Sequence, residues 1–152
     1  MKISEETPLS LSLIDTNILV YAHFEEAVHH AVSLALLDRA QAGELALCVT
    51  SQVLAEFYSV VTSPKRVTSP FTPEEAVDAI EQIATMPGMT ILSAPADVLS
   101  RWLDLARKHP VSGARIFDLQ LIAGMQANGV ATVYTFDSAH FEPFDGIGVL
   151  TP

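Results

Sequence analysis

The chain has 152 residues, of which 49% are hydrophobic and 17% are charged, a composition that indicates a folded globular protein and excludes a disordered or fibrous one. A formal net charge of -10 argues against binding nucleic acid through a broad basic surface. Residues 1–15 lack the features of a signal peptide, and no apolar run approaches the roughly 18 residues of a membrane span. We therefore expect no membrane and a cytoplasmic location, which the single cysteine, Cys48, also favours because it cannot form an intramolecular disulfide.

Strand and helix patterns alternate along the first half of the chain. An apolar run that ends in an acid, residues 11–15, predicts a strand that leads directly into a helix over 16–24. A second helix is expected over 26–42, a strand over 44–50 and a helix over 51–62. The expected buried face of the second helix consists of apolar residues at near-helical spacing: Val28, Val32, Ala35, Leu36 and Ala40.

The second half begins with a connection rich in Pro, Ser and Thr over 63–73. Thr72 and Glu75 form a capping-box pattern that opens a helix ending near Thr85. The remaining expected elements are a strand over 89–92, an amphipathic helix ending near His109, a loop over 110–115, a helix over 116–128 and a strand over 131–137.

Strands separated by helices throughout predict an α/β fold with a parallel sheet, covered on both faces and built from right-handed crossovers. We expect a single domain over 1–152 with its core at about 11–150. In such folds ligands bind at the carboxyl ends of the strands. Acidic residues at strand ends are therefore the first candidates for a functional site.

Four acids stand out by their context. Asp15 and Asp137 end predicted strands, whereas Glu56 and Asp118 interrupt apolar helical surroundings. A carboxylate in an apolar setting carries a large desolvation cost unless it is paired or binds a metal. Hard oxygen ligands suit Mg²⁺ or Mn²⁺, and such ions promote hydrolysis of phosphodiesters. If the four acids meet, the pattern predicts a metal-dependent phosphodiesterase.

Each acid also has a purely structural interpretation. Asp15 is a plausible N-cap for the following helix, and Asp137 fits an Asx turn. Glu56 is compatible with an exposed helix position, and Asp118 with a favourable place near a helix N-terminus. Only the joint spacing of the four acids favours the functional interpretation over the structural one.

Four segments resemble the acidic motifs of the PIN domain family, and most closely those of VapC-type toxin ribonucleases. These are LIDTNILVYA at 13–22, VLAEFYSVV at 53–61, ARIFDLQLIA at 114–123 and VYTFDSAHF at 133–141, and the resemblance extends from residue 13 to about 150. It implies a three-layer α/β/α sandwich with a mainly parallel central sheet. It also implies a homodimeric, Mg²⁺- or Mn²⁺-dependent endoribonuclease whose active-site groove is blocked by the C-terminal segment of a cognate antitoxin protein.

The resemblance further implies roles for individual residues. Asp15, Glu56 and Asp118 would be the principal metal ligands, and Asp137 would complete the site. Thr16 and Thr135 would support it by hydrogen bonding, and Asn17 would shape the turn. Arg115, three residues before Asp118, is the candidate for a substrate phosphate, with a salt bridge or simple solvation as the equal alternative. The other basic residues of the second half, including Lys65 and Arg66, are expected to be solvated surface.

The histidines suggest no separate site. His29 and His30 are adjacent on a predicted helix, where side chains point about 100° apart and do not chelate one ion well. His140 lies in the same loop as Asp137, whereas members of a catalytic triad need separate elements to align.

Two other functions remain open. An aspartate-dependent phosphatase would use Asp15 as its nucleophile, but its usual second acid two positions later is Asn17 here. A non-catalytic PIN-like module that binds RNA or protein is the other alternative, and the presence of all four acids weighs against it.

Overall fold

A five-stranded, fully parallel sheet forms the centre of the protein, in a computed structural model that describes residues 9–152. The strand order is β3-β2-β1-β4-β5. The strands are β1 (Leu11–Ile14), β2 (Ala46–Thr50), β3 (Met89–Leu92), β4 (Thr132–Tyr134) and β5 (Gly148–Leu150).

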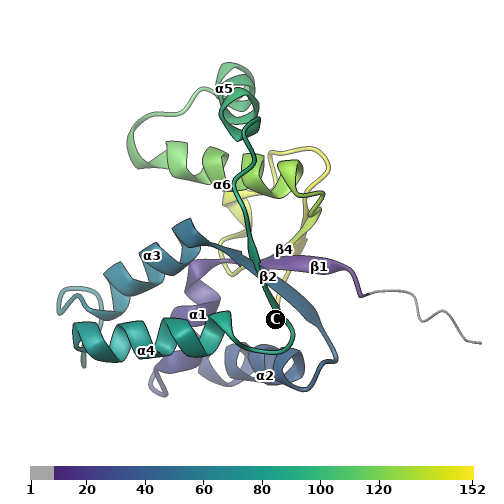
Figure 1. The fold of residues 1–152 in the computed structure, drawn as a ribbon. Helices are drawn as coiled ribbons and strands as arrows, with labels where there is room; N and C mark the ends of the chain where they lie inside the picture. Colours follow the sequence, from purple (N-terminus) through teal and green to yellow (C-terminus); the bar gives the residue numbers. More distant parts are fainter. Residues whose placement is uncertain (1–8) are drawn as a thin grey trace, which may run out of the picture.

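Helices cover both faces of this sheet, as Figure 1 shows, with α1 to α4 on one side and α5 and α6 on the other. They are α1 (Thr16–His23), α2 (His30–Gln41), α3 (Ser51–Val61), α4 (Pro73–Ala84), α5 (Val98–Lys108) and α6 (Ile116–Ala127), with short 3-10 helices η1 (Gly113–Arg115) and η2 (Ser138–His140). The predicted three-layer α/β/α sandwich is confirmed. None of the described helices is long and apolar enough to span a membrane.

The two layers of helices follow from the direction of the crossovers. The chain moves from β1 to β2 and β3 in one direction, and then crosses back over β1 to reach β4. Right-handed crossovers that run in opposite directions along a sheet place their helices on opposite faces. The helices before β3 and those after it therefore lie on different sides of the sheet.

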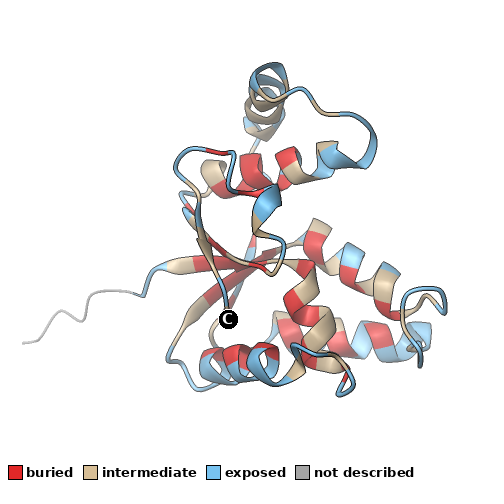
Figure 2. Cartoon of the chain, turned by 180° about the vertical axis from the view of Figure 1, so that it is seen from behind, coloured by how far each residue is buried: buried red, intermediate tan, exposed pale blue. Residues whose placement is uncertain are grey.

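The core lies between the sheet and the inner faces of the helices. Leu13, Leu47 and Val133 of the three central strands are fully buried, as are Phe57 of α3 and Ile122 of α6. Figure 2 shows this burial concentrated along the central strands and on the sides of the helices that face them. Cys48 of β2 is also fully buried, and burial raises the pKa of its thiol to about 12.

The second helix differs from its prediction in both start and face. It begins at His30 instead of residue 26, because two turns, closed by hydrogen bonds from Ala27 N–H to the Phe24 carbonyl and from His30 N–H to the Ala27 carbonyl, precede it. The predicted apolar face is correct at Leu36 and Ala40, which are buried, and wrong at Val28 and Val32, which are 94% and 44% exposed. The face that packs on the core instead consists of Ser33, Leu36, Leu37 and Ala40.

Strand boundaries near the carboxyl end of the sheet also differ. The strand predicted over 131–137 ends at Tyr134, and only one further backbone hydrogen bond, from Thr135 N–H to the Leu150 carbonyl, extends the pairing. Asp137 consequently follows β4 by three residues instead of ending it. The strand predicted over 44–50 begins at Ala46, and β5 was not predicted.

Candidate active site

A cleft of about 670 Å³ opens beside the carboxyl ends of β1 and β4. These two strands are neighbours in the sheet, but the connections that leave them run in opposite directions, from β1 toward β2 and from β4 toward β5. Such a switch point leaves a crevice between the diverging connections, where ligands of parallel α/β folds bind. The cleft therefore lies where a site is expected from topology alone.

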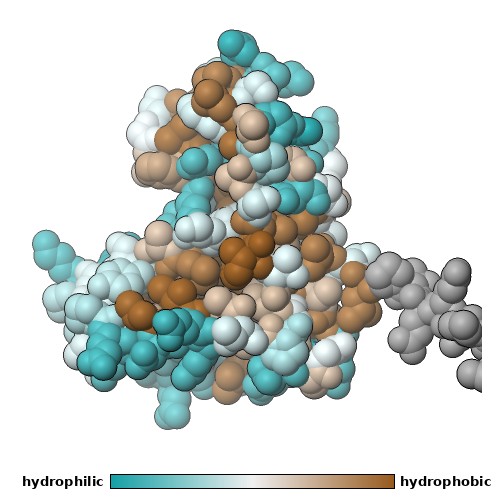
Figure 3. Space-filling view, viewed as in Figure 1, coloured by the Kyte–Doolittle hydropathy of each residue, from teal (hydrophilic) through white to brown (hydrophobic). Residues whose placement is uncertain are grey.

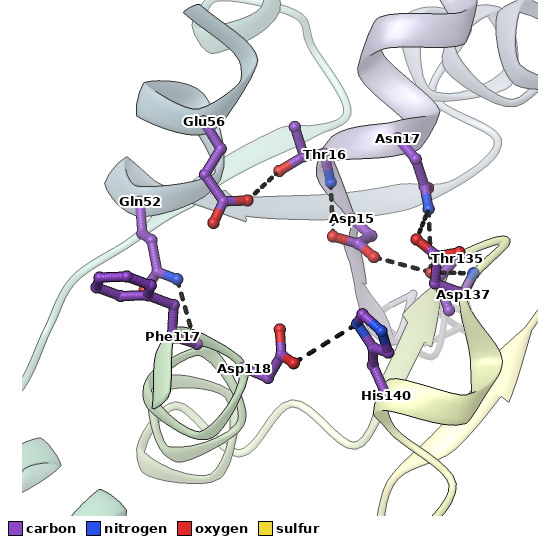
Figure 4. Close-up of polar contacts among 10 residues, drawn as sticks. All are labelled: Asp15, Thr16, Asn17, Gln52, Glu56, Phe117, Asp118, Thr135, Asp137 and His140. Carbon is purple, nitrogen blue, oxygen red and sulfur yellow. Dashed lines mark hydrogen bonds and ion pairs between the residues drawn. The ribbon is translucent and has the colours of Figure 1, made fainter. Parts of the chain in front are cut away.

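All four predicted acids line this cleft. Asp15 follows β1 as the N-cap of α1, and Glu56 lies in the middle of α3. Asp118 lies in the first turn of α6, and Asp137 immediately precedes η2. Figure 4 shows Glu56, Asp15 and Asp118 facing a common open space, with Asp137 beside Asp15.

Hydrogen bonds link Asp15 and Glu56 through Thr16. The Asp15 carboxylate accepts from the Thr16 backbone N–H and from the Thr135 hydroxyl, each at 2.8 Å. Thr16 in turn donates its hydroxyl to Glu56 Oε2, also at 2.8 Å. The N-cap interpretation of Asp15 is therefore correct, and it leaves both carboxylate oxygens at the cleft.

Asp137 joins the same network through Asn17 and Thr135. The Asn17 side-chain amide donates to Asp137 Oδ2 at 3.2 Å, and the Asp137 backbone N–H donates to the Thr135 hydroxyl oxygen at 2.9 Å. Asn17 lies inside the first turn of α1, after the N-cap Asp15. Its side chain therefore does not form the turn before the helix but contacts Asp137. The buried Thr135 hydroxyl thus contacts both strand-end acids.

Asp118 approaches from the opposite wall. Its nearest charged partner is His140, with 3.5 Å between Asp118 Oδ2 and His140 Nδ1, an ion pair only when the imidazole is protonated. Figure 4 shows this pair facing Asp15 and Glu56 across the open centre. Within residues 9–152, no three acidic, histidine or cysteine side chains are close enough together to form a preformed metal site. The acids share a cleft without forming a closed cage.

Burial differs among the acids in a way that the sequence did not predict. Asp15 is partly buried, and burial raises the pKa of its carboxyl group; Glu56 and Asp137 raise it further, while hydrogen bonds from Thr135 and Thr16 lower it. Glu56 and Asp137 are exposed to the cleft. The apolar surroundings expected of Glu56 are therefore not observed, whereas Asp118, the other acid for which they were expected, is partly buried.

Two arginines line the cleft beside the acids, Arg115 at the end of η1 and Arg66 in the loop after α3. Neither forms an ion pair with any acid among residues 9–152, although Arg39, Arg101 and Arg107 each do so elsewhere on the surface. The salt-bridge alternative for Arg115 is thus not realised. Both guanidinium groups are exposed and free to contact an anion.

Sequence reasoning missed three other residues that line the cleft, namely His140, Arg66 and Tyr21. Tyr21 follows Asn17 by four positions on one helix, so that spacing alone places it on the same face. The position of Arg66 depends on how the Pro-rich loop folds back beside α3, for which the sequence carries no signal.

The donor set of the cleft fits a divalent cation. Carboxylate oxygens are the ligands that Mg²⁺ and Mn²⁺ prefer. Among the described residues, Asp15, Glu56 and Asp137 form no ion pair with a basic side chain, so their negative charge is uncompensated. Burial raises the pKa of Asp15, and the nearby Glu56 and Asp137 raise it further, so its ionised form would be stabilised by a cation in the cleft.

Comparison with known proteins identifies the family. The model of the PIN domain matches residues 12–146, nearly the whole chain, and the chain belongs to this family. The resemblance inferred from the four acidic segments is thereby confirmed.

The relatives and solved structures agree with this assignment. The chain is 28% identical over 138 residues to "Ribonuclease VapC48" of Mycobacterium tuberculosis, covering 91% of this chain and 94% of that protein. It is 31% identical over 110 residues to "Ribonuclease VapC43" of the same species, covering 72% and 75%. The fold matches M. tuberculosis VapC20, described as a Sarcin-Ricin loop cleaving toxin, with a TM-score of 0.64 at 17% identity over 94% of this chain and 100% of that one. VapBC2 from Rickettsia felis, bound to a promoter DNA fragment, gives a TM-score of 0.61 at 21% identity, covering 93% and 98%.

Proposed function

We propose that this chain is a metal-dependent endoribonuclease and the toxin of a toxin–antitoxin pair. The observation that carries the proposal is that four acids from four separate segments of a PIN-family chain line one cleft at the switch point of the sheet. The names of its relatives, which are ribonucleases of the VapC type, support RNA as the substrate. We further propose that the whole chain is a single domain with its core over about 11–150.

Asp15, Glu56, Asp118 and Asp137 are the proposed ligands of Mg²⁺ or Mn²⁺. A divalent ion held there supplies activation of water and neutralisation of charge on the phosphate. The chain's own residues orient the carboxylates: Thr16 and Thr135 donate hydroxyl groups to Glu56 and Asp15, and the Asn17 amide fixes Asp137. These fixed hydrogen bonds hold the acids in place against their mutual repulsion before any cation binds.

Arg115 is the proposed contact for a substrate phosphate. It ends η1, directly before the first turn of α6 that carries Asp118, and both residues line the cleft. It forms no ion pair with a described acid. A planar guanidinium group binds phosphate in a bidentate manner and is well suited to this role. Arg66 provides a second guanidinium group from the loop that follows α3. A few well-placed arginines would account for RNA binding by a chain of such negative net charge.

The proposed partners are an antitoxin protein and a second copy of the chain, in the cytoplasm. Figure 3 shows apolar side chains on α5 and in the band below it. Leu99 and Leu103 of α5 are 54% and 38% exposed, and Ile91 of the edge strand β3 is 43% exposed. Apolar side chains exposed in this number on one face are typical of a protein interface.

A ribonuclease assay tests the proposed function. Asp118→Asn is compared with Asp38→Asn, which changes an exposed acid of α2 that does not line the cleft. We expect the wild type and Asp38→Asn to cleave single-stranded RNA in the presence of Mg²⁺ or Mn²⁺, and this cleavage to stop when EDTA is added. We expect Asp118→Asn to keep its fold but to lose cleavage. Cleavage that persists in Asp118→Asn or in EDTA would contradict the proposal.

The alternative of a non-catalytic binding module is favoured by one observation, that no preformed group of metal ligands exists within residues 9–152. Wild-type protein that binds RNA tightly but leaves it intact at all Mg²⁺ and Mn²⁺ concentrations would support it. A phosphorylated Asp15 trapped after exposure to a phosphate ester would instead indicate the phosphatase.

A further inference from the structure

Three aromatic rings form a cluster at the edge of the cleft. His29 stacks on Phe136, with ring centroids 4.0 Å apart and planes 12° from parallel. Tyr21 packs against both rings, with its centroid 5.6 Å from each. We call these three residues the aromatic cluster. They come from α1, from the turn before α2 and from the segment between β4 and η2.

The aromatic cluster is directly connected to the acidic site. Phe136 immediately precedes Asp137, and Tyr21 itself lines the cleft. Tyr21 lies one helical turn after Asn17, the residue that holds Asp137. An RNA strand with a phosphate at the acids would therefore pass beside Tyr21, the ring of the aromatic cluster that lines the cleft.

The outermost ring is held in place but remains exposed. Phe136 covers one face of His29, and His29 as a whole is exposed. Its neighbour His30 forms a hydrogen bond of 2.8 Å between Nδ1 and the Tyr21 backbone carbonyl, which fixes the turn that carries His29. Tyr21 and Phe136 are half-buried and support the stack from below. A fixed ring with an open face needs no reordering to accept another flat ring.

From these contacts we propose that the aromatic cluster, through the open face of His29, stacks an unpaired RNA base next to the site of cleavage. The inference rests on the proposed function and names the form of its substrate. Every base presents a π-face, and stacking on aromatic side chains is how proteins bind single-stranded RNA whose bases are splayed out. A base inside a duplex has both faces covered and is not available. The aromatic cluster thus selects single-stranded segments, loops or ends.

The test uses the variants His29→Ala and His29→Trp beside Val28→Ala. Val28 is 94% exposed in the same turn and carries no ring, so it is the matched control. Binding of a single-stranded RNA oligonucleotide that contains 2-aminopurine is followed by fluorescence quenching, and cleavage of the same RNA gives KM and kcat. Removal of one stacking ring is expected to weaken binding and raise KM by roughly five- to a hundredfold with little change in kcat. His29→Trp should restore binding, and Val28→Ala should match the wild type.

A scan of abasic positions along the oligonucleotide sharpens this test. Removal of the base at one position beside the cleavage site should weaken binding of the oligonucleotide to the wild type. Removal of the same base should not weaken binding to His29→Ala any further. Equal KM and quenching in His29→Ala and Val28→Ala would overturn the inference while cleavage remained intact. Loss of antitoxin binding without any change in RNA binding would also overturn it, by making the aromatic cluster a protein contact. Failure of the proposed function is distinguishable, because the wild type itself would then fail to cleave the oligonucleotide, whether or not it quenched its fluorescence.

Discussion

Asp15 is the residue on which the electrostatics of the cleft converge. Burial raises the pKa of its carboxyl group, and the neighbouring Glu56 and Asp137 raise it further. A carboxyl group whose pKa is higher in the folded than in the unfolded protein favours folding when it is protonated. This contribution to the free energy of unfolding is complete below the ordinary aspartate pKa of about 3.9, and it is lost as pH rises through the raised pKa of the folded state. At neutral pH the ionised Asp15 therefore destabilises the metal-free fold.

Asp15→Asn should remove this cost. We expect the free energy of unfolding of the metal-free variant to equal or exceed that of the wild type at neutral pH, and the difference to disappear in acid. Addition of Mn²⁺ should stabilise the wild type more than the variant, because the variant has lost one of the four proposed carboxylate ligands. Chemical denaturation with and without Mn²⁺ measures both effects. A variant that is clearly less stable than wild type without metal at neutral pH would show that Asp15 is a structural acid.

Thr135 is the residue expected to position the acids. Its buried hydroxyl donates to Asp15 and accepts from the Asp137 backbone N–H. Thr135→Val keeps the shape but removes both hydrogen bonds, and loss of such a supporting contact is expected to weaken metal affinity or activity by about ten- to a hundredfold. The control is Thr85→Val, which loses an exposed hydroxyl contact at the end of α4. Titration of activity with Mn²⁺ distinguishes them, and equal curves for both variants would refute the role of Thr135.

At the scale of elements, Gly88 fixes the approach of the loop before β3 to the end of α2. A Cβ atom at this position would lie 2.3 Å from the Ala40 carbonyl oxygen and 2.6 Å from that of Leu45. Both contacts involve backbone, which cannot move aside cheaply, so Gly88→Ala should cost roughly 1–3 kcal/mol of stability. Gly124, inside α6, has nothing within 4 Å of such a Cβ, and Gly124→Ala should stabilise by about 0.5–1 kcal/mol. Thermal unfolding should give shifts of opposite sign, and shifts of the same sign would contradict this packing.

The elements also show what the sequence predicts well. Capping signals and apolar runs located α4, with its capping box at Thr72 and Glu75, and the strands β1 and β3. The face of α2 was predicted only in part, because the fully buried Ser33 replaces an apolar residue in its stripe, while Val28 and Val32 are exposed. Strand β5 was missed because it is only three residues long and begins with glycine, so it shows no alternation.

The candidate site was predictable to a similar degree. Local context singled out the four acids, because strand ends and interrupted apolar helices are visible in the sequence, whereas the supporting roles of Thr16, Asn17 and Thr135 came from the resemblance to the PIN domain family. Which residues reach across the cleft is set by long-range packing. The contact between His140 and Asp118 and the approach of Arg66 therefore had no local signal.

At the scale of the whole molecule, α5 is the one α-helix among the described residues that has no buried residue. No residue of this amphipathic helix is buried, and Leu99 and Leu103 are exposed on it. We expect Leu99→Asp combined with Leu103→Asp to convert the proposed homodimer into a monomer, because charge in an apolar interface is strongly unfavourable. Val32→Asp, at an apolar position of α2 that is 44% exposed, is the control and should stay dimeric. Light scattering measures the mass of each variant, and a double variant that remains dimeric would place the interface elsewhere.

The binding of cations by the acids of the cleft is tested most directly by crystals grown with Mn²⁺. An anomalous difference map should show a peak between the carboxylates of Asp15 and Asp118, the two walls of the cleft, and this peak should be absent in crystals of Asp118→Asn. A map with no peak there at saturating Mn²⁺, or a peak that persists unchanged in Asp118→Asn, would contradict a metal site built from these acids.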